Sequence, residues 1–148
     1  MQLLPCSILG VFMKVTEQGA VPTVVLETEG AGNVPIYVGL WEALSISNAM
    51  RGEVLPRPIT HDLFADLLGK CEINVHALHI DSLEGGVFYS KLLFSFNGHS
   101  DILDCRPSDG IAIALRVAAP IFMDESVCTA AAVEKSELSD LKDIRTFL

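Results

Sequence analysis

The apolar residues of this chain come in short runs that glycine, proline and polar residues interrupt. No run approaches the roughly 20 apolar residues that a membrane-spanning helix needs. The first run, 3–15, contains Pro5 and lacks a basic start, which favours a core strand over a signal peptide. A chain of 148 residues can bury one substantial core. We therefore expect a cytoplasmic domain built from short elements.

Alternating apolar and polar residues, separated by turn signals, predict a sheet made mostly of hairpins. Gly30 and Gly32 mark a turn between the second and third strands, and Gly85-Gly86 and Asn97-Gly98 mark two more. The expected strands are 6–15, 21–29, 33–38, 72–81, 87–96, 101–105 and 121–123.

Helical spacing appears between and after these strands. We expect helices over 41–51, from Thr60 as N-cap to Gly69, from Pro107 to 118, and over 125–132. The sequence thus predicts an α+β fold, with a mixed, largely antiparallel sheet of about six to eight strands and three to four helices packed on it. Residues 1–132 would form the domain, and 133–148 a C-terminal amphipathic extension that can be helical.

The formal net charge is −9, and only ten residues are basic. Non-specific nucleic-acid binding draws on Lys and Arg contacts to phosphate, so this charge argues against a protein that coats DNA. It permits an enzyme that meets its substrate briefly. The four cysteines are far apart in the sequence and form no Cys-x-x-Cys pair, so we interpret them as free thiols and not as zinc ligands.

Three polar motifs stand in apolar surroundings: 34–43 (VPIYVGLWEA), 57–62 (RPITHD) and 104–116 (DCRPSDGIAIALR), the last followed by Ala119-Pro120-Ile121. Their order and spacing resemble the bifunctional nuclease domain family over roughly 8–127. The resemblance implies a mixed-sheet α+β fold, an oligomer and, for some members, degradation of both DNA and RNA. It brings no catalytic residue set with it. Gly110 stands where many relatives have Ala, which we expect to be a mild change.

The second motif offers His61 and Asp62 in the first turn of a helix, with Arg57 nearby. Histidine can act as general acid or base near neutral pH, and helix N-termini attract phosphate. The alternative is structural: Thr60 caps the helix, Asp62 interacts with its free amides, and His61 is a surface or packing residue.

The third motif offers Asp104, Arg106, Ser108 and Asp109 at a strand-to-helix junction. Two carboxylates with an intervening arginine could hold a metal and a phosphate. Alternatively Ser108 or Asp109 caps the helix and Arg106 pairs with Asp62 or Glu42 in a structural ion network. Glu42, in the first turn of its own helix, is either a metal ligand or a residue that the helix dipole favours.

We expect the first turns of three helices to meet at one cleft. His76 and His79, three apart on a strand, point to opposite faces, and His99 follows a turn, so these histidines are not expected to bind metal. The predicted roles are catalytic for His61, Asp62, Asp104, Arg106 and Asp109; substrate-binding for Arg57, Thr60 and Ser108; and metal-binding for Glu42, Asp62 and Asp109.

The leading functional hypothesis is a nuclease that hydrolyses DNA and RNA with the help of a divalent metal, Mg²⁺ or Mn²⁺. Nucleic acid would be a transient substrate, and the chain would form a homodimer or a larger homo-oligomer, with no membrane partner. The first alternative is a non-catalytic interaction or regulatory module whose polar motifs are caps and ion pairs. A third reading is a domain that binds a small anionic metabolite at its helix N-termini.

Overall fold

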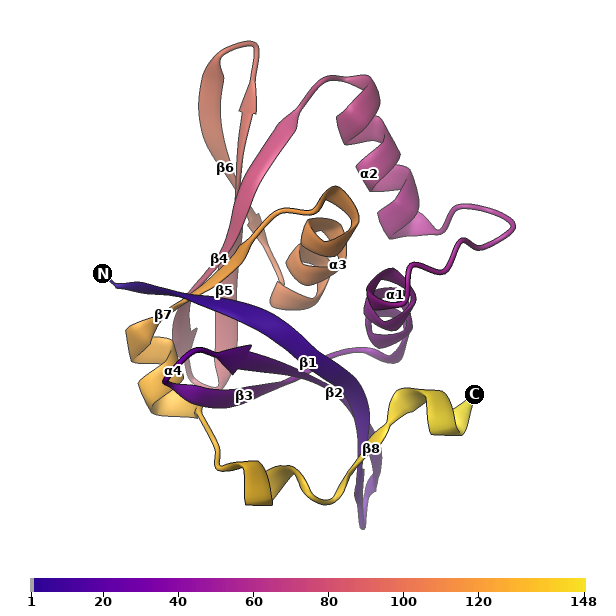
Figure 1. The fold of residues 1–148 in the computed structure, drawn as a ribbon, viewed down its shortest axis with the longest axis vertical. Coiled ribbons are helices and arrows are strands. Elements are labelled where there is room, and N and C mark those ends of the chain that lie inside the picture. The colour runs from indigo at the N-terminus through magenta and orange to yellow at the C-terminus, as the bar shows by residue number, and fades with distance from the viewer. Residues whose placement is uncertain (1) are drawn as a thin grey trace.

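A single curved sheet of eight strands organises residues 2–148, the part of the chain that the computed structural model describes (Figure 1). The strand order is β3-β2-β1-β7-β4-β5-β6, and β8 also pairs with β1. The strands are β1 (Leu3–Thr16), β2 (Gly19–Thr28), β3 (Gly32–Tyr37), β4 (Asn74–Glu84), β5 (Val87–Phe96), β6 (His99–Cys105), β7 (Ile121–Asp124) and β8 (Leu141–Asp143). The α+β fold with a mixed, mostly antiparallel sheet is confirmed.

Strand β1 joins the two halves of the sheet. One of its edges pairs with β2 from Cys6 to Thr16, with an irregularity between Ile8 and Gly10. Its other edge pairs with β7 near its beginning and with β8 near its end. Strands β4 and β7 run parallel, while the other pairs of described strands are antiparallel.

Three helices lie together on one side of the sheet, and the fourth lies apart from them (Figure 1). Helix α3 contacts α1, α2, β4 and β5, so it stands at the centre of this layer. Helix α4 contacts β3, β4 and β7 instead. The bounds are α1 (Leu40–Met50), α2 (Thr60–Lys70), α3 (Pro107–Val117) and α4 (Glu125–Ala131).

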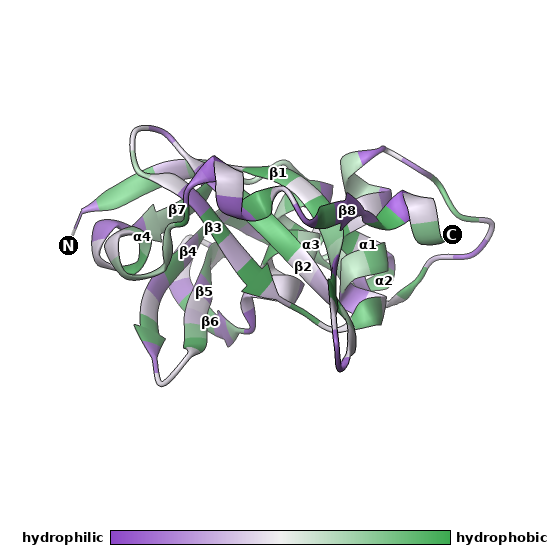
Figure 2. Cartoon of the chain, turned by 90° about the horizontal axis from the view of Figure 1, so that it is seen from below, coloured by the Kyte–Doolittle hydropathy of each residue, from purple (hydrophilic) through white to green (hydrophobic). Residues whose placement is uncertain are grey.

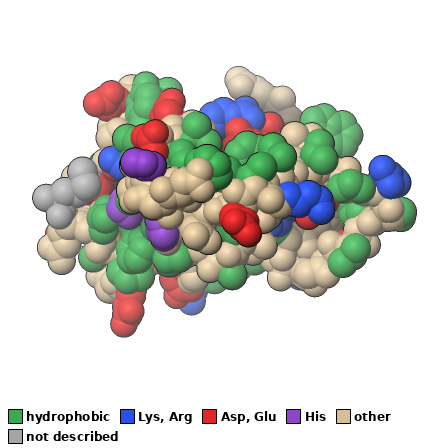
Figure 3. Space-filling view, turned by 90° about the horizontal axis from the view of Figure 1, so that it is seen from above, with side chains coloured by type: hydrophobic (Ala, Val, Ile, Leu, Met, Phe, Trp, Pro, Cys, Tyr) green, Lys and Arg blue, Asp and Glu red, His purple; other side chains and the backbone are tan. Residues whose placement is uncertain are grey.

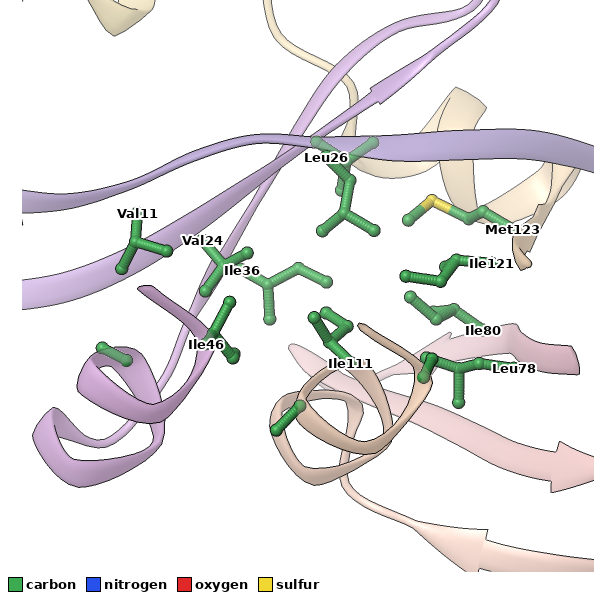
Figure 4. Close-up of a cluster of buried hydrophobic side chains, with 14 of the residues drawn as sticks. Val11, Val24, Leu26, Ile36, Ile46, Leu78, Ile80, Ile111, Ile121 and Met123 are labelled. Atoms are coloured by element: carbon green, nitrogen blue, oxygen red, sulfur yellow. The ribbon is translucent and has the colours of Figure 1, made fainter. Parts of the chain in front are cut away.

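The core lies between α1, α3 and the sheet (Figure 4). Leu26 of β2, Ile46 of α1, Leu78 and Ile80 of β4, and Ile111 of α3 are fully buried there. Burial of each such side chain stabilises the fold by about 1.5–3 kcal/mol. Figure 2 shows hydrophobic stretches coloured green along β2 and α1. This packing fixes where the helices begin, and therefore where the polar motifs lie.

Gly110 marks the closest approach of α3 to the sheet. A Cβ at this position would stand 2.5 Å from Cδ1 of Leu78 and 3.0 Å from Sγ of Cys105. An alanine here would therefore require the fully buried Leu78 side chain to shift, and the mild effect expected from the sequence stays a prediction.

Two local predictions are wrong. Residues after 133 do not form a helix: 3₁₀ turns Lys135–Leu138 and Ile144–Phe147 flank β8, and Ile144 is buried against the core. Pairing with β1 stabilises this segment more than an exposed helix would, because it pairs the segment with a strand of the sheet and accompanies the burial of Ile144. The N-cap of α2 is Ile59, not Thr60; the Asp62 carboxylate accepts a hydrogen bond from the Ile59 amide (3.0 Å) and so replaces a capping hydroxyl.

No helix of the described chain is both long enough and apolar enough to cross a bilayer.

Candidate active site

The first halves of α1, α2 and α3 meet at a cluster of hydrogen-bonded polar side chains. Helix α1 contributes Glu42 and Ser45, α2 contributes His61, and α3 contributes Asp109. Arg106 is the N-cap residue of α3, directly after strand β6. The cluster exists because α3 packs against both other helices and brings their first turns together.

His61 stands between a hydroxyl and a carboxylate. Its Nδ1 lies 2.6 Å from Ser45 Oγ, and its Nε2 lies 2.9 Å from Asp109 Oδ1. An ionised carboxylate only accepts hydrogen bonds, so Nε2–H donates to Asp109, and the Ser45 hydroxyl donates to Nδ1 of the neutral ring. The His61 side chain is only 14% exposed. The ring is therefore held in one orientation from both sides.

Arg106 links the second oxygen of Asp109 to Glu42. Its Nε donates to Asp109 Oδ2 at 2.8 Å, and its Nη2 donates to Glu42 Oε1 at 3.0 Å. Gly39 makes room for this contact, because a Cβ there would collide with the Glu42 carboxylate. The Arg106 side chain is 66% exposed, so N–H groups that these two bonds do not use can meet a ligand.

The charges in the cluster are coupled. Burial by itself would raise the pKa of Asp109, but hydrogen bonds from Arg106 and His61 outweigh it and hold that pKa below its ordinary value. Asp109 is therefore ionised at neutral pH. Two carboxylates and one guanidinium leave one negative charge when His61 is neutral, and none when His61 is protonated. The cluster by itself therefore has no excess positive charge with which to bind an anionic substrate.

Asp62 belongs to a different ion pair. Arg116 Nε donates to Asp62 Oδ1 at 2.7 Å, and this hydrogen bond is the main reason that the pKa of Asp62 lies below its ordinary value. Arg116 also donates to the main-chain oxygens of Ala112 and Ser45. These contacts tie α1, α2 and α3 together, which gives Asp62 a structural role beside the cluster.

The three predicted metal ligands do not form one set. Glu42 and Asp109 face the guanidinium of Arg106, and Asp62 faces that of Arg116. Among residues 2–148, no three or more His, Cys, Asp or Glu side chains are arranged to hold a metal ion. The residues therefore do not fit a cation bound by Glu42, Asp62 and Asp109 together.

The other predicted site residues lie around the cluster or away from it. Asp104 is exposed on β6, opposite Lys91 of β5, outside the cluster's hydrogen-bond network. Arg57 is exposed in the loop before α2. Thr60 lines the cavity beside His61, and Ser108 is buried against the next cavity. The roles predicted for these residues stay predictions.

Sequence reasoning missed Ser45 and Arg116. Ser45 is buried, one helical turn after Glu42, and this spacing of three residues on one helix face was a usable signal. Arg116 ends the third motif, but its partner Asp62 is 54 residues away in the sequence, and no local pattern indicates that pairing.

A cavity of about 450 Å³ opens in front of the cluster. Trp41, Ser45, His61, Arg106 and Asp109 are among the residues that line it. A second cavity of about 540 Å³ adjoins it, and Arg106 belongs to the walls of both. Both volumes lie in the range of about 300–1,000 Å³ that is usual for ligand sites.

A sequence model of the bifunctional nuclease domain matches residues 24–136, which span α1 to α4 and every member of the cluster. The chain belongs to the bifunctional nuclease domain family. An uncharacterised protein of Mycobacterium tuberculosis is 38% identical over 114 residues, covering 77% of this chain and 68% of that protein.

Two plant relatives of this bifunctional nuclease domain carry the activity in their names. Bifunctional nuclease 1 of Oryza sativa subsp. indica and the bifunctional nuclease of Oryza minuta are each 26% identical over 109 residues. In each case the match covers 70% of this chain and 33% of the plant protein.

Proposed function

We propose that this chain is a nuclease that hydrolyses phosphodiester bonds of DNA and RNA at the cluster of Ser45, His61, Arg106 and Asp109. The observation that carries the proposal is His61, held between the Ser45 hydroxyl and the Asp109 carboxylate beside an exposed arginine. Membership of the family, and the names of the plant relatives, support the same chemistry.

Each member has a definite task in this proposal. Arg106 binds a phosphate oxygen through N–H groups that its two carboxylate partners leave free. Asp109 orients His61 through Nε2 and stabilises the imidazolium. Nδ1 is then the nitrogen that takes the proton of the attacking water, either directly or through Ser45 Oγ, which passes its own proton to Nδ1 as it receives one from water. The imidazolium can return that proton to the leaving oxygen.

Metal assistance is a separate part of the proposal. The site carries one negative charge with neutral His61, so a divalent ion that accompanies the phosphate, Mg²⁺ or Mn²⁺, would improve substrate binding. We also propose that the enzyme is a homo-oligomer, because helix α2 exposes Leu63 and Leu67 by 63% and 60%. A cytoplasmic location is part of the same proposal.

The second candidate is a non-catalytic module. It is favoured by one observation: every charged group of the cluster already has a charged partner within it, as expected of a purely structural network.

Hydrolysis assays separate the two functions. Purified protein is incubated with single- and double-stranded DNA and RNA, in Mg²⁺, in Mn²⁺ and in EDTA. His61→Ala and Asp109→Asn should each lower the cleavage rate by about 100-fold or more, because the first removes the general base and the second removes the charge that orients it and stabilises its imidazolium. EDTA should slow cleavage if a metal assists it, and leave it unchanged if none does.

Matched controls exist in the same chain. His76→Ala removes a histidine whose Nε2 lies 2.8 Å from Ser95 Oγ on exposed strands. Asp143→Asn breaks an exposed aspartate–arginine pair with Arg145. Both controls should keep wild-type rates. Activity that survives unchanged in His61→Ala and Asp109→Asn would come from a contaminant or another site, and would contradict the proposal.

A further inference from the structure

The two cavities beside Arg106 and a third cavity share wall residues, and we call these three cavities together the groove. The larger of the two cavities beside Arg106, in front of β3, also shares Tyr37 with the third cavity of about 450 Å³ that Lys14 and Gln18 help to line. The shared wall residues place Lys14, Tyr37, Arg106 and Trp41 in sequence along one surface path. Basic and aromatic side chains thus alternate along the groove.

The aromatic rings in this groove are unusually open to solvent. Trp41 is 77% exposed and Tyr37 is 59% exposed, although both belong to the segment that leads from β3 into α1. Phe88 adds a partly buried ring to the wall of the middle cavity. Flat exposed rings beside cations are the feature that proteins use to stack unpaired bases.

Lys14 and Arg106 are the cations of this groove, and both can contact phosphates of a nucleic-acid backbone. Lys14 Nζ donates to the Tyr37 hydroxyl at 3.1 Å and lies 5.6 Å from the centre of its ring. The hydrogen bond with Tyr37 raises the pKa of Lys14, so its charge is kept at neutral pH. Arg106 stands between the other two cavities. Glu17, Glu42 and Asp109 line the same three cavities, so Lys14 and Arg106 can contact single phosphates, but the groove as a whole carries no excess of positive charge.

We propose that the substrate at this groove is single-stranded nucleic acid, with a phosphate at Arg106 and flanking bases stacked on Trp41 and Tyr37. The proposal rests on the nuclease function proposed above and names its substrate class. A duplex keeps the faces of its bases stacked on each other, so they cannot reach the two rings. A duplex also binds through many phosphate contacts, and this groove offers only two basic side chains along its walls.

Trp41 is the only tryptophan of the chain and provides a direct probe. Oligothymidylate of about 8 nucleotides is titrated into the wild-type protein at low salt in EDTA, and a gel confirms that it stays intact. Tryptophan fluorescence should be quenched to saturation. A duplex of the same length should bind at least tenfold more weakly in the same titration.

Variants are compared by the fluorescence anisotropy of a labelled oligothymidylate. Trp41→Ala and Tyr37→Ala should each weaken binding about tenfold or more, because each removes a ring on which a base stacks. Tyr37→Phe keeps the ring and should not weaken binding. Lys14→Ala should reduce the dependence of affinity on salt by about one phosphate contact. Tyr89→Ala, on a tyrosine 44% exposed outside the groove, and Lys142→Ala, on exposed β8, should bind like wild type.

The outcomes separate this proposal from the nuclease proposal. Duplex binding as tight as single-strand binding, or wild-type affinity in both Trp41→Ala and Tyr37→Ala, would overturn the groove assignment even if His61-dependent cleavage is observed. Saturable, ring-dependent binding supports the assignment even if no cleavage accompanies it, and in that case the hydrolytic function is the part that fails.

Discussion

Arg116 holds three helices with one side chain. Its guanidinium bonds to Asp62 of α2, to the main-chain oxygen of Ser45 in α1, and to Ala112 in its own helix. The Arg116 side chain is 9% exposed, so its replacement removes the bonds to two main-chain oxygens and leaves the Asp62 carboxylate, which is 34% exposed, without its cation. We expect Arg116 to support the candidate site without touching substrate.

Arg116→Leu should therefore lower the free energy of unfolding by about 2 kcal/mol. Urea unfolding at pH 7 measures it. Arg145→Leu is the matched control, because its pair with Asp143 lies in solvent and should contribute much less to stability. Equal losses in both variants would contradict the structural role of Arg116.

Asp62 and Asp109 contribute to the acid response, together with Asp124 and Asp143, whose pKa values are also lowered. The pKa values of Asp62 and Asp109 are lower in the folded protein than the ordinary value of about 4. Their contribution to stability is complete above that value and is lost as the pH falls below it, because the unfolded chain then binds protons more readily. Between pH 7 and about pH 3.5, Arg116→Leu should lose less stability than wild type, since Asp62 has lost its partner.

At the scale of elements, two glycines in helices should respond in opposite ways to alanine. Gly69 in α2 has no atom near the position of a Cβ, whereas Gly110 in α3 faces Leu78 at 2.5 Å. Gly69→Ala should raise the free energy of unfolding by about 0.5–1 kcal/mol through helix propensity. Gly110→Ala should lower it by about 1 kcal/mol through overpacking.

Thermal or urea unfolding of both variants gives the sign of each change in the free energy of unfolding. Adding Leu78→Val to Gly110→Ala should restore part of the loss, because valine withdraws the methyl group that the new Cβ meets. A stabilised Gly110→Ala variant would show that α3 can move away from β4 without cost.

The accuracy of sequence prediction also differs between elements. The hairpins were predictable because Gly85-Gly86 and Asn97-Gly98 adopt positive φ and fix the turns locally. The C-terminal segment was not, because helical spacing of its apolar residues does not show that β1 offers an unpaired edge. Within the site, first-turn positions indicated Glu42, His61 and Asp109, while the partners of Ser45 and Arg116 follow only from the packing of three helices.

At the scale of the molecule, helix α2 leaves an apolar surface uncovered. None of its residues is buried, and its Phe64, Leu67 and Leu68 line an entirely apolar cavity of about 260 Å³ with side chains of β4 to β6. Figure 3 shows green hydrophobic side chains gathered at the surface in the view from above. This exposed apolar face is the surface on which the proposed contact between copies of the chain would form.

Wild-type protein should then sediment as a dimer or larger species, and Leu67→Glu should shift it toward monomer. Val54→Glu is the control, on a loop side chain that is 94% exposed. A monomeric wild type would refute the proposed contact and leave this face to another partner.

The long first strand has a consequence for folding. Phe12 of β1 lies opposite Asp143, and Leu3 lies opposite Asp124, so this strand pairs with segments that come far later in the sequence. Contacts so distant along the chain form slowly. Until β7 and β8 have docked, that edge of β1 has unpaired main-chain groups that can pair with a strand of another molecule, so these two short strands protect the folding chain from aggregation.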